Sequence, residues 1–430
     1  MTEARSATIG RRLHEITCRV DGADRIGAMS DAAIGELSMR HATLQSCAQW
    51  RYGRGRIARA GAQLVAFGQA VIALAERAVE MPMPGFAHLP PGQIITPGFY
   101  FTAVVDQILR GVRRLLHTHD LSTTAAPGTL PAAASRSWAL DAAADISSIG
   151  VTLSRFGTDL MTWGSSEYGF IDLPDEEPGS STATPRQRNL PVLERIRSEA
   201  GRLSAIHLDL VLGRRDAPAG DMVEVFEEAG AQLSNPFDAL ELALRLLSAV
   251  VMGLEFRAQR VYAVCQNELL GSFTLANLLT LHAGVPRRQA LVIAGEFVSS
   301  ALADGVPPVG VPASLLHTVA ERHGFAVADA ERLLAEAYDV QRSLHFSGSL
   351  GTTHPDAVRA LIARQHADLH HLGLAWSERR SADPAPVSPV ATGQGRSGSP
   401  PQGDAGTRPG LPGRRTGRPG SAGPSRPSAA

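Results

Sequence analysis

Residues 138–163 read WALDAAADISSIGVTLSRFGTDLMTW, and this stretch decides the class of fold. Its apolar residues follow a helical period and leave the segment apolar around much of its circumference. A helix of this kind has to be covered by other elements on most of its sides. We therefore expect residues 138–163 to form a helix at the centre of a bundle.

Four further segments carry the same apolar period of 3.6 residues: 60–80, 99–117, 192–212 and 237–264. The first reads AGAQLVAFGQAVIALAERAVE and is ended by MPMPG. Segments of roughly 20 to 28 residues exceed the average globular helix of about 11, which indicates an extended bundle. Because no alternating strand pattern of comparable length occurs, we predict an all-α fold built of long helices.

A small helical C-terminal domain is expected over residues 266–375. SFTLANLLTLHAGVPRRQALVIAGEFVSSAL predicts a helix, a turn containing Gly284 and Pro286 and a second helix, and VADAERLLAEAY predicts a third. A Gly-rich turn then precedes a short helix that begins near Pro355. Residues 376–430 are rich in Pro, Gly, Ser and Arg and cannot bury enough apolar area to fold, so we expect a disordered tail.

The composition of the 430 residues argues against several classes of function. Hydrophobic residues make up 44% and aromatic residues 5%, which suits a helical core. A formal net charge of −1 favours neither a nucleic acid nor a membrane as partner. The three cysteines form no CxxC pair, so no disulfide framework or zinc site is expected. The first residues lack the apolar core of a signal peptide, and no window approaches the roughly 20 apolar residues of a spanning helix, so we expect a soluble, cytoplasmic protein.

Two segments between the long helices are candidates for a site, because function concentrates on loops held by a rigid scaffold. The first reads MPGFAHLPPGQIITPG and places His88 among prolines and glycines. On such a stiff, irregular loop an imidazole can be aimed without helical constraints. A surface histidine without function is the alternative interpretation.

The second candidate segment, residues 176–197, reads EEPGSSTATPRQRNLPVLERIR. It combines four hydroxyls and two cations with an acid in the helix that follows: Ser180, Ser181, Thr182, Thr184, Arg186, Arg188 and Glu194. Hydroxyls and cations close together suit the binding of carboxylates and the stabilisation of a carbanion. A polar linker is the alternative interpretation.

Together these segments resemble the argininosuccinate lyase branch of the fumarase/aspartase superfamily. GSSTATPRQRNLPVLERIRSEAGRL is similar to the superfamily signature, and MPGFAHLPPGQIIT is similar to the loop that carries the family's catalytic His. WGSSEYGFIDLPD, SFTLANLLTLHAGVPRRQA and GSLGTTHPDAVRALIA match in the family's order. The resemblance covers about residues 9–365. It implies a remnant of the family's N-terminal domain at residues 1–35 and the family's central long-helix bundle at residues 36–265.

The resemblance implies β-elimination from a succinyl group, which releases fumarate and an amine without a cofactor. In the family a base removes the Cβ proton, cations and hydroxyls hold the aci-carboxylate, and an acid protonates the departing nitrogen. The family's catalytic His corresponds to His88, and the Glu that pairs with it to Glu194. The catalytic hydroxyl corresponds to Ser181 or to Thr182, depending on the register of the loop.

The substrate-binding positions implied by the resemblance are Ser38, Arg40, Gln93, Arg186, Arg188 and Asn189. Several of them depart from the family's pattern. The segment SMRHA has Met39 and Arg40 where the family has Arg and Asn, Ala87 replaces a Thr, and Arg188 replaces the carboxylate-stabilising Lys. Guanidinium stays charged and binds carboxylates in a planar fork, so anion binding is expected to persist with altered geometry. The residues that grip the amino-acid half of argininosuccinate are not matched.

These departures leave two hypotheses open. In the first, the chain is a carbon–nitrogen lyase that releases fumarate, or a related unsaturated acid, from an N-substituted aspartate with a specialised leaving amine. In the second, it is an inactive homologue that serves as a structural or regulatory subunit. The sequence identifies neither the leaving amine nor the role of the tail.

The resemblance also implies a homotetramer whose active sites are composed from three subunits, with a small molecule as the substrate. The apolar face of residues 237–264 would then bury against partner helices. His366 and His370 are four residues apart on an expected helix, but neither an HExxH glutamate nor a third ligand accompanies them. We therefore predict no metal site.

Overall fold

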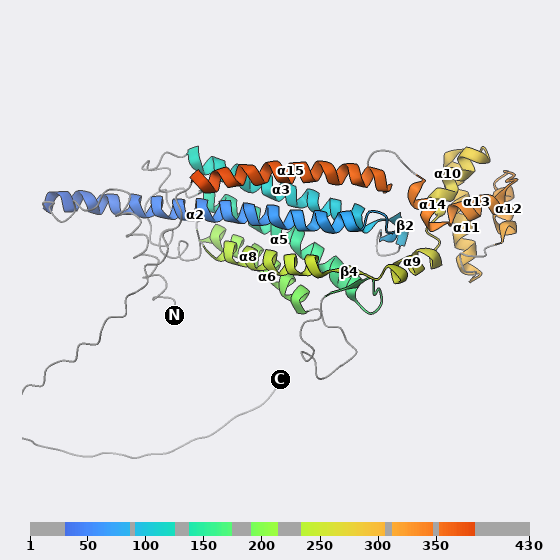
Figure 1. Cartoon of the computed structure of the whole chain (residues 1–430), viewed down its shortest axis with the longest axis horizontal. Helices are drawn as coiled ribbons and strands as arrows, with labels where there is room; N and C mark the ends of the chain where they lie inside the picture. Colours follow the sequence, from blue (N-terminus) through green and yellow to red (C-terminus); the bar gives the residue numbers. More distant parts are fainter. Residues whose placement is uncertain are drawn as a thin grey trace, which may run out of the picture. The chain divides into compact units, whose positions relative to one another are not determined.

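The computed structural model describes residues 31–86, 91–124, 137–173, 191–213, 234–305, 312–346 and 352–382, with side chains from residue 52 onward. These residues belong to one compact unit of the chain, Met1–Val387. Helices dominate the described part, which confirms the predicted all-α fold with an extended bundle (Figure 1).

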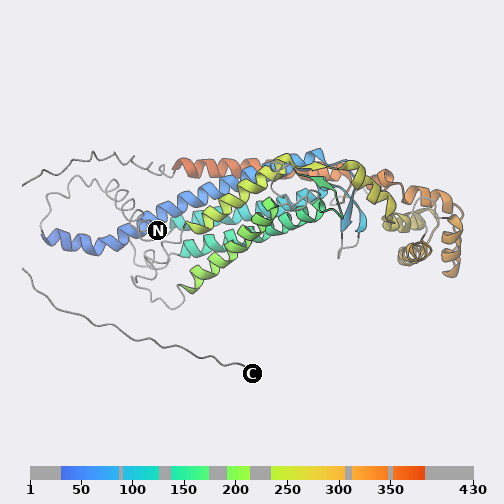
Figure 2. The same ribbon diagram turned by 90° about the horizontal axis from the view of Figure 1, so that it is seen from below.

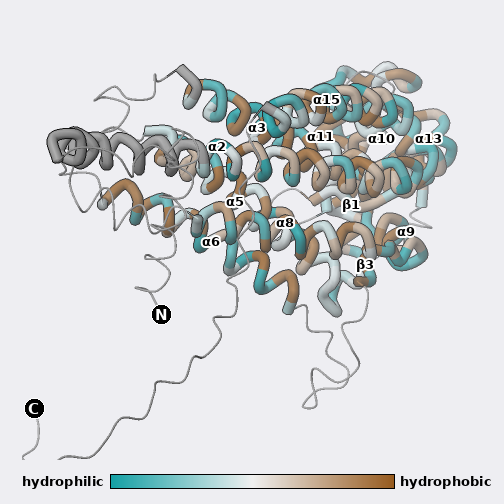
Figure 3. Tube along the Cα trace, turned by 60° about the vertical axis from the view of Figure 1, so that its left-hand side comes forward, coloured by the Kyte–Doolittle hydropathy of each residue, from teal (hydrophilic) through white to brown (hydrophobic). Residues whose placement is uncertain are grey.

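Within the described residues the bundle consists of six helices: α2 (Asp31–Arg77), α3 (Pro97–Thr124), α5 (Ser137–Gly164), α6 (Pro191–Leu212), α8 (Asn235–Gly253) and α15 (Pro355–Ala382). α2 packs against α3, α8 and α15, and α6 packs against α5 and α8. The same helices run alongside one another in the second view (Figure 2). Apolar and polar residues alternate along them at the helical period, as Figure 3 shows.

α5 is the interior helix that the apolar stretch 138–163 predicts. It contacts α3, α6 and α8. Its buried residues include both tryptophans at its ends, Trp138 and Trp163, and three large side chains between them, Ile146, Leu153 and Phe156. Contacts with three other helices are what a helix that is apolar around much of its circumference requires.

The predicted continuous helix over residues 237–264 is wrong. α8 ends at Gly253, strand β4 (Glu255–Phe256) follows, and a new helix, α9 (Ala258–Asn267), begins. Leu254 between them is extended, with φ −72° and ψ 127°, and its side chain is buried. β4 pairs with strand β3 (Ile171–Asp172) through the partners Ile171 and Phe256. Pairing with a strand some 85 positions earlier in the sequence leaves no mark on local periodicity.

The helix expected to begin near Pro355 does begin there, but it is not short. α15 continues for 28 residues to Ala382 and therefore passes residue 376, where the tail was expected to start. It packs along α2 and α3. Its buried residues Val358, Ile362, Leu369, Leu372 and Trp376 join the core of the bundle, although residues 355–375 were assigned to the C-terminal domain.

The segment Tyr52–Arg77 of α2 is long and apolar enough to cross a membrane by length and composition. This finding corrects the expectation that no segment of the chain is long and apolar enough to span a membrane. Most of the apolar window is buried inside the bundle, and the core helix of a globular protein passes the same test.

A second core lies among the helices α10 (Ser272–His282), α11 (Arg287–Ala303), α12 (Ala313–Arg322) and α13 (Ala330–Ala337). A short helix, α14 (Val340–His345), follows. Val340 and Leu344 of α14 pack with Ile94, Cys265 and Leu270 in a separate small cluster. This cluster connects the smaller region to α9 and to the hairpin described below.

Candidate active site

The two described strands that flank the position of His88 pair with each other as a β-hairpin. Strand β1 (Met83–Phe86) pairs antiparallel with strand β2 (Pro91–Ile95), with Met83 opposite Ile95. Met83 and Ile94 are buried. Gly85 lies so close to its partner strand that a Cβ there would sit 2.8 Å from Cγ2 of Ile95. His88 itself, at positions 87–90 between the strands, lies outside the described residues.

The segment that leads to the signature leaves the end of α5 by a tight turn. The amide of Phe170 donates to the carbonyl of Trp163 at 2.8 Å, and the amide of Gly169 donates to the carbonyl of Ser165 at 2.7 Å. Gly169 has φ +60°, a left-handed conformation that glycine adopts without steric cost. β3 follows directly. The predicted site residues between it and α6 lie outside the described residues: Ser181, Thr182, Arg186, Arg188 and Asn189.

An aromatic cluster connects the two segments. The ring of Phe86, at the end of β1, stacks on Phe170 at a centroid distance of 6.2 Å and meets the edge of Tyr168 at 5.4 Å. Tyr168 and Phe170 are in turn edge to face at 5.4 Å. The strand that ends two residues before His88 therefore contacts the segment that leads to the signature, within one chain.

Glu194 lies in the first turn of α6, and its side chain is exposed. Its neighbours Leu193 and Ile196 are fully buried, so the helix turns Glu194 away from the core. Among the described residues it has no ion-pair partner. α6 is anchored nearby on α5, where Arg197 donates to Sδ of Met161 at 3.6 Å. The first turn of α6, which carries Glu194, thus lies near the end of α5. The segment that leads to the signature starts from that same end of α5.

The remaining substrate-binding candidates are distributed over two regions. Gln93 is exposed on β2, opposite Gly85 of β1. Ser38 and Arg40 lie in α2, but their side chains are outside the described part. α2 is continuous from there to Arg77, and 37 residues of helix at 1.5 Å each span roughly 55 Å. One chain therefore does not bring Ser38 or Arg40 to its own hairpin.

Tyr100 is a residue near these segments that the sequence analysis missed. Its hydroxyl donates to Oδ2 of Asp159 at 2.6 Å, which ties the start of α3 to the last turns of α5. Burial, together with the neighbouring carboxylate, raises the pKa of Tyr100. The side chain thus remains a neutral donor and positions α5. Only the fold reveals this contact, because 59 positions separate the two residues.

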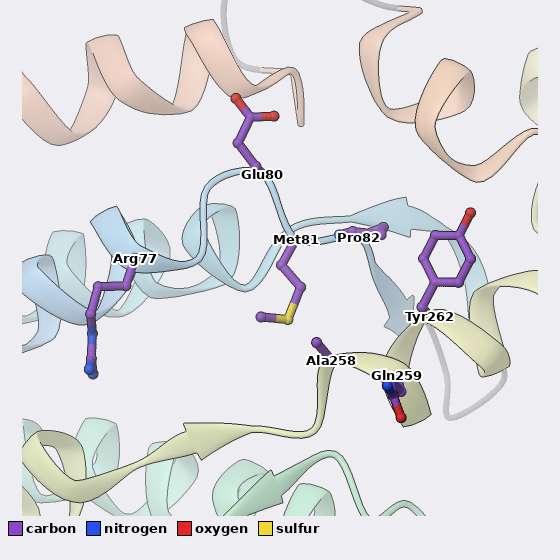
Figure 4. Close-up of a pocket in the computed structure, with 7 residues that line it drawn as sticks. All are labelled: Arg77, Glu80, Met81, Pro82, Ala258, Gln259 and Tyr262. Atoms are coloured by element: carbon purple, nitrogen blue, oxygen red, sulfur yellow. The ribbon is translucent and has the colours of Figure 1, made fainter.

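An open pocket of about 510 Å³ lies just before the hairpin, between the end of α2 and the start of α9. Figure 4 shows Glu80 turned towards α15, while Met81 points towards Ala258. The Glu80 carboxylate pairs with Arg359 and with Nε2 of His345, the latter at 3.5 Å. Glu194, the one predicted catalytic residue that the structure describes, does not line this pocket, and we assign the pocket no role in the reaction.

His366 and His370 are both exposed on α15. Within the part of the chain that the structure describes, no group of three or more His, Cys, Asp or Glu side chains is arranged to hold a metal ion.

Known proteins are similar to this chain in sequence and in fold. No protein-family model matches. Argininosuccinate lyase from Chloroflexus aurantiacus is 27% identical over 324 residues, which cover 69% of this chain and 68% of that protein. Among solved structures, an EDDS lyase variant with bound fumarate has a TM-score of 0.73 at 18% identity, covering 89% of this chain and 84% of that one. A fumarate lyase from Mesorhizobium sp. BNC1 has a TM-score of 0.56 at 17% identity, with 75% of each chain covered.

Proposed function

We propose that this chain, which is similar in sequence to argininosuccinate lyase and in fold to EDDS lyase, is a divergent member of their superfamily and a carbon–nitrogen lyase. Its reaction is a β-elimination that releases fumarate, or a related unsaturated acid, from an N-substituted aspartate. The leaving amine differs from arginine, because the positions that hold the amino-acid half of argininosuccinate are altered. No cofactor takes part.

The proposed chemistry divides among three sets of side chains. The hydroxyl of Ser181 or Thr182 removes the Cβ proton, and Arg186, Arg188 and Asn189 hold the dianionic aci-carboxylate that forms. His88, paired with Glu194, protonates the departing nitrogen. The carbon–nitrogen bond then breaks with the electron pair on nitrogen, and the carbon–carbon double bond forms.

The observation that carries this proposal is the contact of Phe86 with Tyr168 and Phe170. It supports the assignment because it places the strand leading to His88 against the segment leading to the hydroxyls and cations. Exposed Glu194, without a partner in the described chain, is available for an imidazole or a substrate.

We also propose a cytoplasmic homotetramer with composite active sites. The span of roughly 55 Å between Arg40 and the end of α2 supports it, because Ser38 and Arg40 then serve the hairpin of another subunit.

The alternative is an inactive homologue with a structural or regulatory role. The replacements at Met39, Ala87 and Arg188 favour it, because they remove groups on which the family's reaction depends. The two functions differ in one property, which is turnover by the purified chain alone.

The first experiment is a fumarate assay by ultraviolet absorbance. Purified protein is mixed with argininosuccinate and with a panel of N-succinylated amines and amino acids. We expect product from at least one substrate, and we expect His88→Ala to reduce kcat at least about a hundredfold, because general acid–base catalysis contributes about 10² to 10⁴.

The control is His366→Ala, an exposed histidine on α15 outside the proposed site. It should keep the wild-type rate. If well-folded wild-type protein releases no fumarate from any substrate of the panel, the lyase proposal is overturned and the inactive homologue is favoured.

A further inference from the structure

Two arginines at the start of α9 bind the segment Glu167–Asp172, which leads to the signature: Arg257, the residue before the helix, and Arg260 in its first turn. Arg257 donates to both carboxylate oxygens of Asp172, from Nε at 2.6 Å and from a terminal nitrogen at 2.7 Å. Its backbone amide donates to the carbonyl of Phe170 at 2.9 Å. Arg260, one turn later, donates to the carbonyls of Tyr168 and Glu167, each at 3.2 Å.

These contacts fix consecutive positions of the segment and leave little freedom in its path. Two parallel bonds between a guanidinium and a carboxylate fix orientation as well as distance, which a lysine does not reproduce. The pairing of Ile171 with Phe256 adds backbone hydrogen bonds beside them. The start of α9 and the segment Glu167–Asp172 are therefore connected by side-chain and backbone hydrogen bonds along the length of the segment.

The same segment adjoins both regions of the chain to which the proposed function assigns reacting groups. Its aromatic residues Tyr168 and Phe170 contact Phe86, at the end of the strand that leads to His88. Its last residue, Asp172, precedes the first of the signature's candidate residues, Ser181, by nine positions. A shift of this segment would displace both regions.

We propose that Arg257 and Arg260 are positioning residues of the active site, which set the geometry of the reacting groups through the segment Glu167–Asp172. The proposal rests on the lyase function proposed above. Neither arginine is assigned a contact with the substrate.

The solvent exposure of the Arg257–Asp172 ion pair makes it possible to distinguish a positioning role from a contribution to folding stability. The side chains of Arg257 and Asp172 are 40% and 36% exposed. Exposed ion pairs contribute little to folding. A misplacement of about 1 Å, in contrast, reduces a reaction rate about a hundredfold. Loss of the pair should therefore affect turnover far more than stability.

The test compares Arg257→Lys with a matched control, Arg113→Lys. Arg113 pairs with Asp368 at 2.8 Å with similar exposure, but it joins α3 to α15 away from the segment. We expect Arg257→Lys to lower kcat at least about tenfold with a Tm shift of about 3 °C or less. The control should keep the wild-type kcat. The double variant Arg257→Asp with Asp172→Arg should recover part of the turnover that each single change removes.

Hydrogen exchange of the amides of residues 167–172 supplies a readout that needs no substrate. Exchange should accelerate in Arg257→Lys and stay unchanged in Arg113→Lys. If the wild type proves inactive, this measurement still tests the restraint, and only the lyase function fails. Unchanged exchange, or an active Arg257→Lys variant with the wild-type kcat, would overturn the proposal.

Discussion

At the scale of single residues, the exposure of a proposed catalytic side chain follows from the packing of the helix that carries it. Glu194 illustrates this: its buried neighbours Leu193 and Ile196 hold α6 on α5, and the helical period then turns the carboxylate outward. A carboxylate in the first turn of a helix is also favoured by the helix dipole. Its position therefore needs no ion-pair partner to be stable.

Glu194→Gln tests that role. The amide keeps the shape of the side chain but cannot stabilise a protonated imidazole, so we expect kcat to fall by about tenfold or more. Because Glu194 is exposed, Tm should change little. The matched control is Glu199→Gln, on the same helix and paired with Arg202 at 3.1 Å. Equal rates for both variants and the wild type would contradict the proposed pairing of His88 with Glu194.

At the scale of elements, the bundle depends on close approach between helices at particular glycines. Gly61 of α2 faces the indole of Trp376 on α15, and a Cβ at Gly61 would overlap that ring. Gly55, less than two turns earlier on α2, is exposed and has open space around it. Two glycines of one helix thus serve different purposes.

Alanine at these two positions should give effects of opposite sign. Gly61→Ala forces Trp376 or the helices apart, and we expect it to destabilise the fold by about 1–3 kcal/mol. Gly55→Ala restricts the unfolded chain and improves helix propensity, and it should stabilise by about 0.5–1 kcal/mol. Thermal unfolding at a fixed protein concentration measures both. A stabilising Gly61→Ala would mean that α2 and α15 do not pack as described.

The far ends of α3 and α15 are joined by a bidentate ion pair. Arg379 donates to both oxygens of Asp120, at 2.7 and 2.6 Å. The hydrogen bond from Arg379 lowers the pKa of the Asp120 carboxyl, so the folded state favours its charged form. Stability from this group is therefore present above the unfolded pKa of about 3.9 and is lost as pH falls through the lower folded value.

Asp120→Asn should consequently lower Tm at neutral pH, and the difference from wild type should shrink below about pH 4. The carboxyl is 47% exposed, so solvent screening limits the effect to about 0.5–1 kcal/mol. Asp106→Asn is the control, because Asp106 pairs with Arg110 within α3 and joins no second element. A Tm difference that grows at acid pH would contradict the assignment.

At the scale of the whole molecule, the length of α2 determines what one chain can do alone. Ser38 and Arg40 lie roughly 55 Å from the end of the helix that leads to the hairpin. Both regions can belong to one active site only if different subunits supply them. In that case the proposed reaction requires the oligomer, because a single chain lacks a complete active site.

We expect light scattering after size exclusion to give about 180 kDa, four times the 45.4 kDa of one chain. A mixture of Arg40→Ala and His88→Ala subunits, reassembled after dissociation, should regain part of the activity that each variant lacks. Some sites in mixed tetramers would then combine an intact Arg40 with an intact His88. A monomer, or mixtures as inactive as their components, would exclude composite sites.

The sequence by itself determined the class of the fold and the resemblance to argininosuccinate lyases, because long apolar periods and ordered motifs are local properties of the chain. The apolar stretch 138–163 predicted the interior helix α5, and Pro355 predicted the start of α15. Tertiary structure alone decided the break between α8 and α9, the return of α15 to the bundle and the arginine contacts of the segment Glu167–Asp172. Each of these joins residues far apart in the chain, and no local pattern records such pairs.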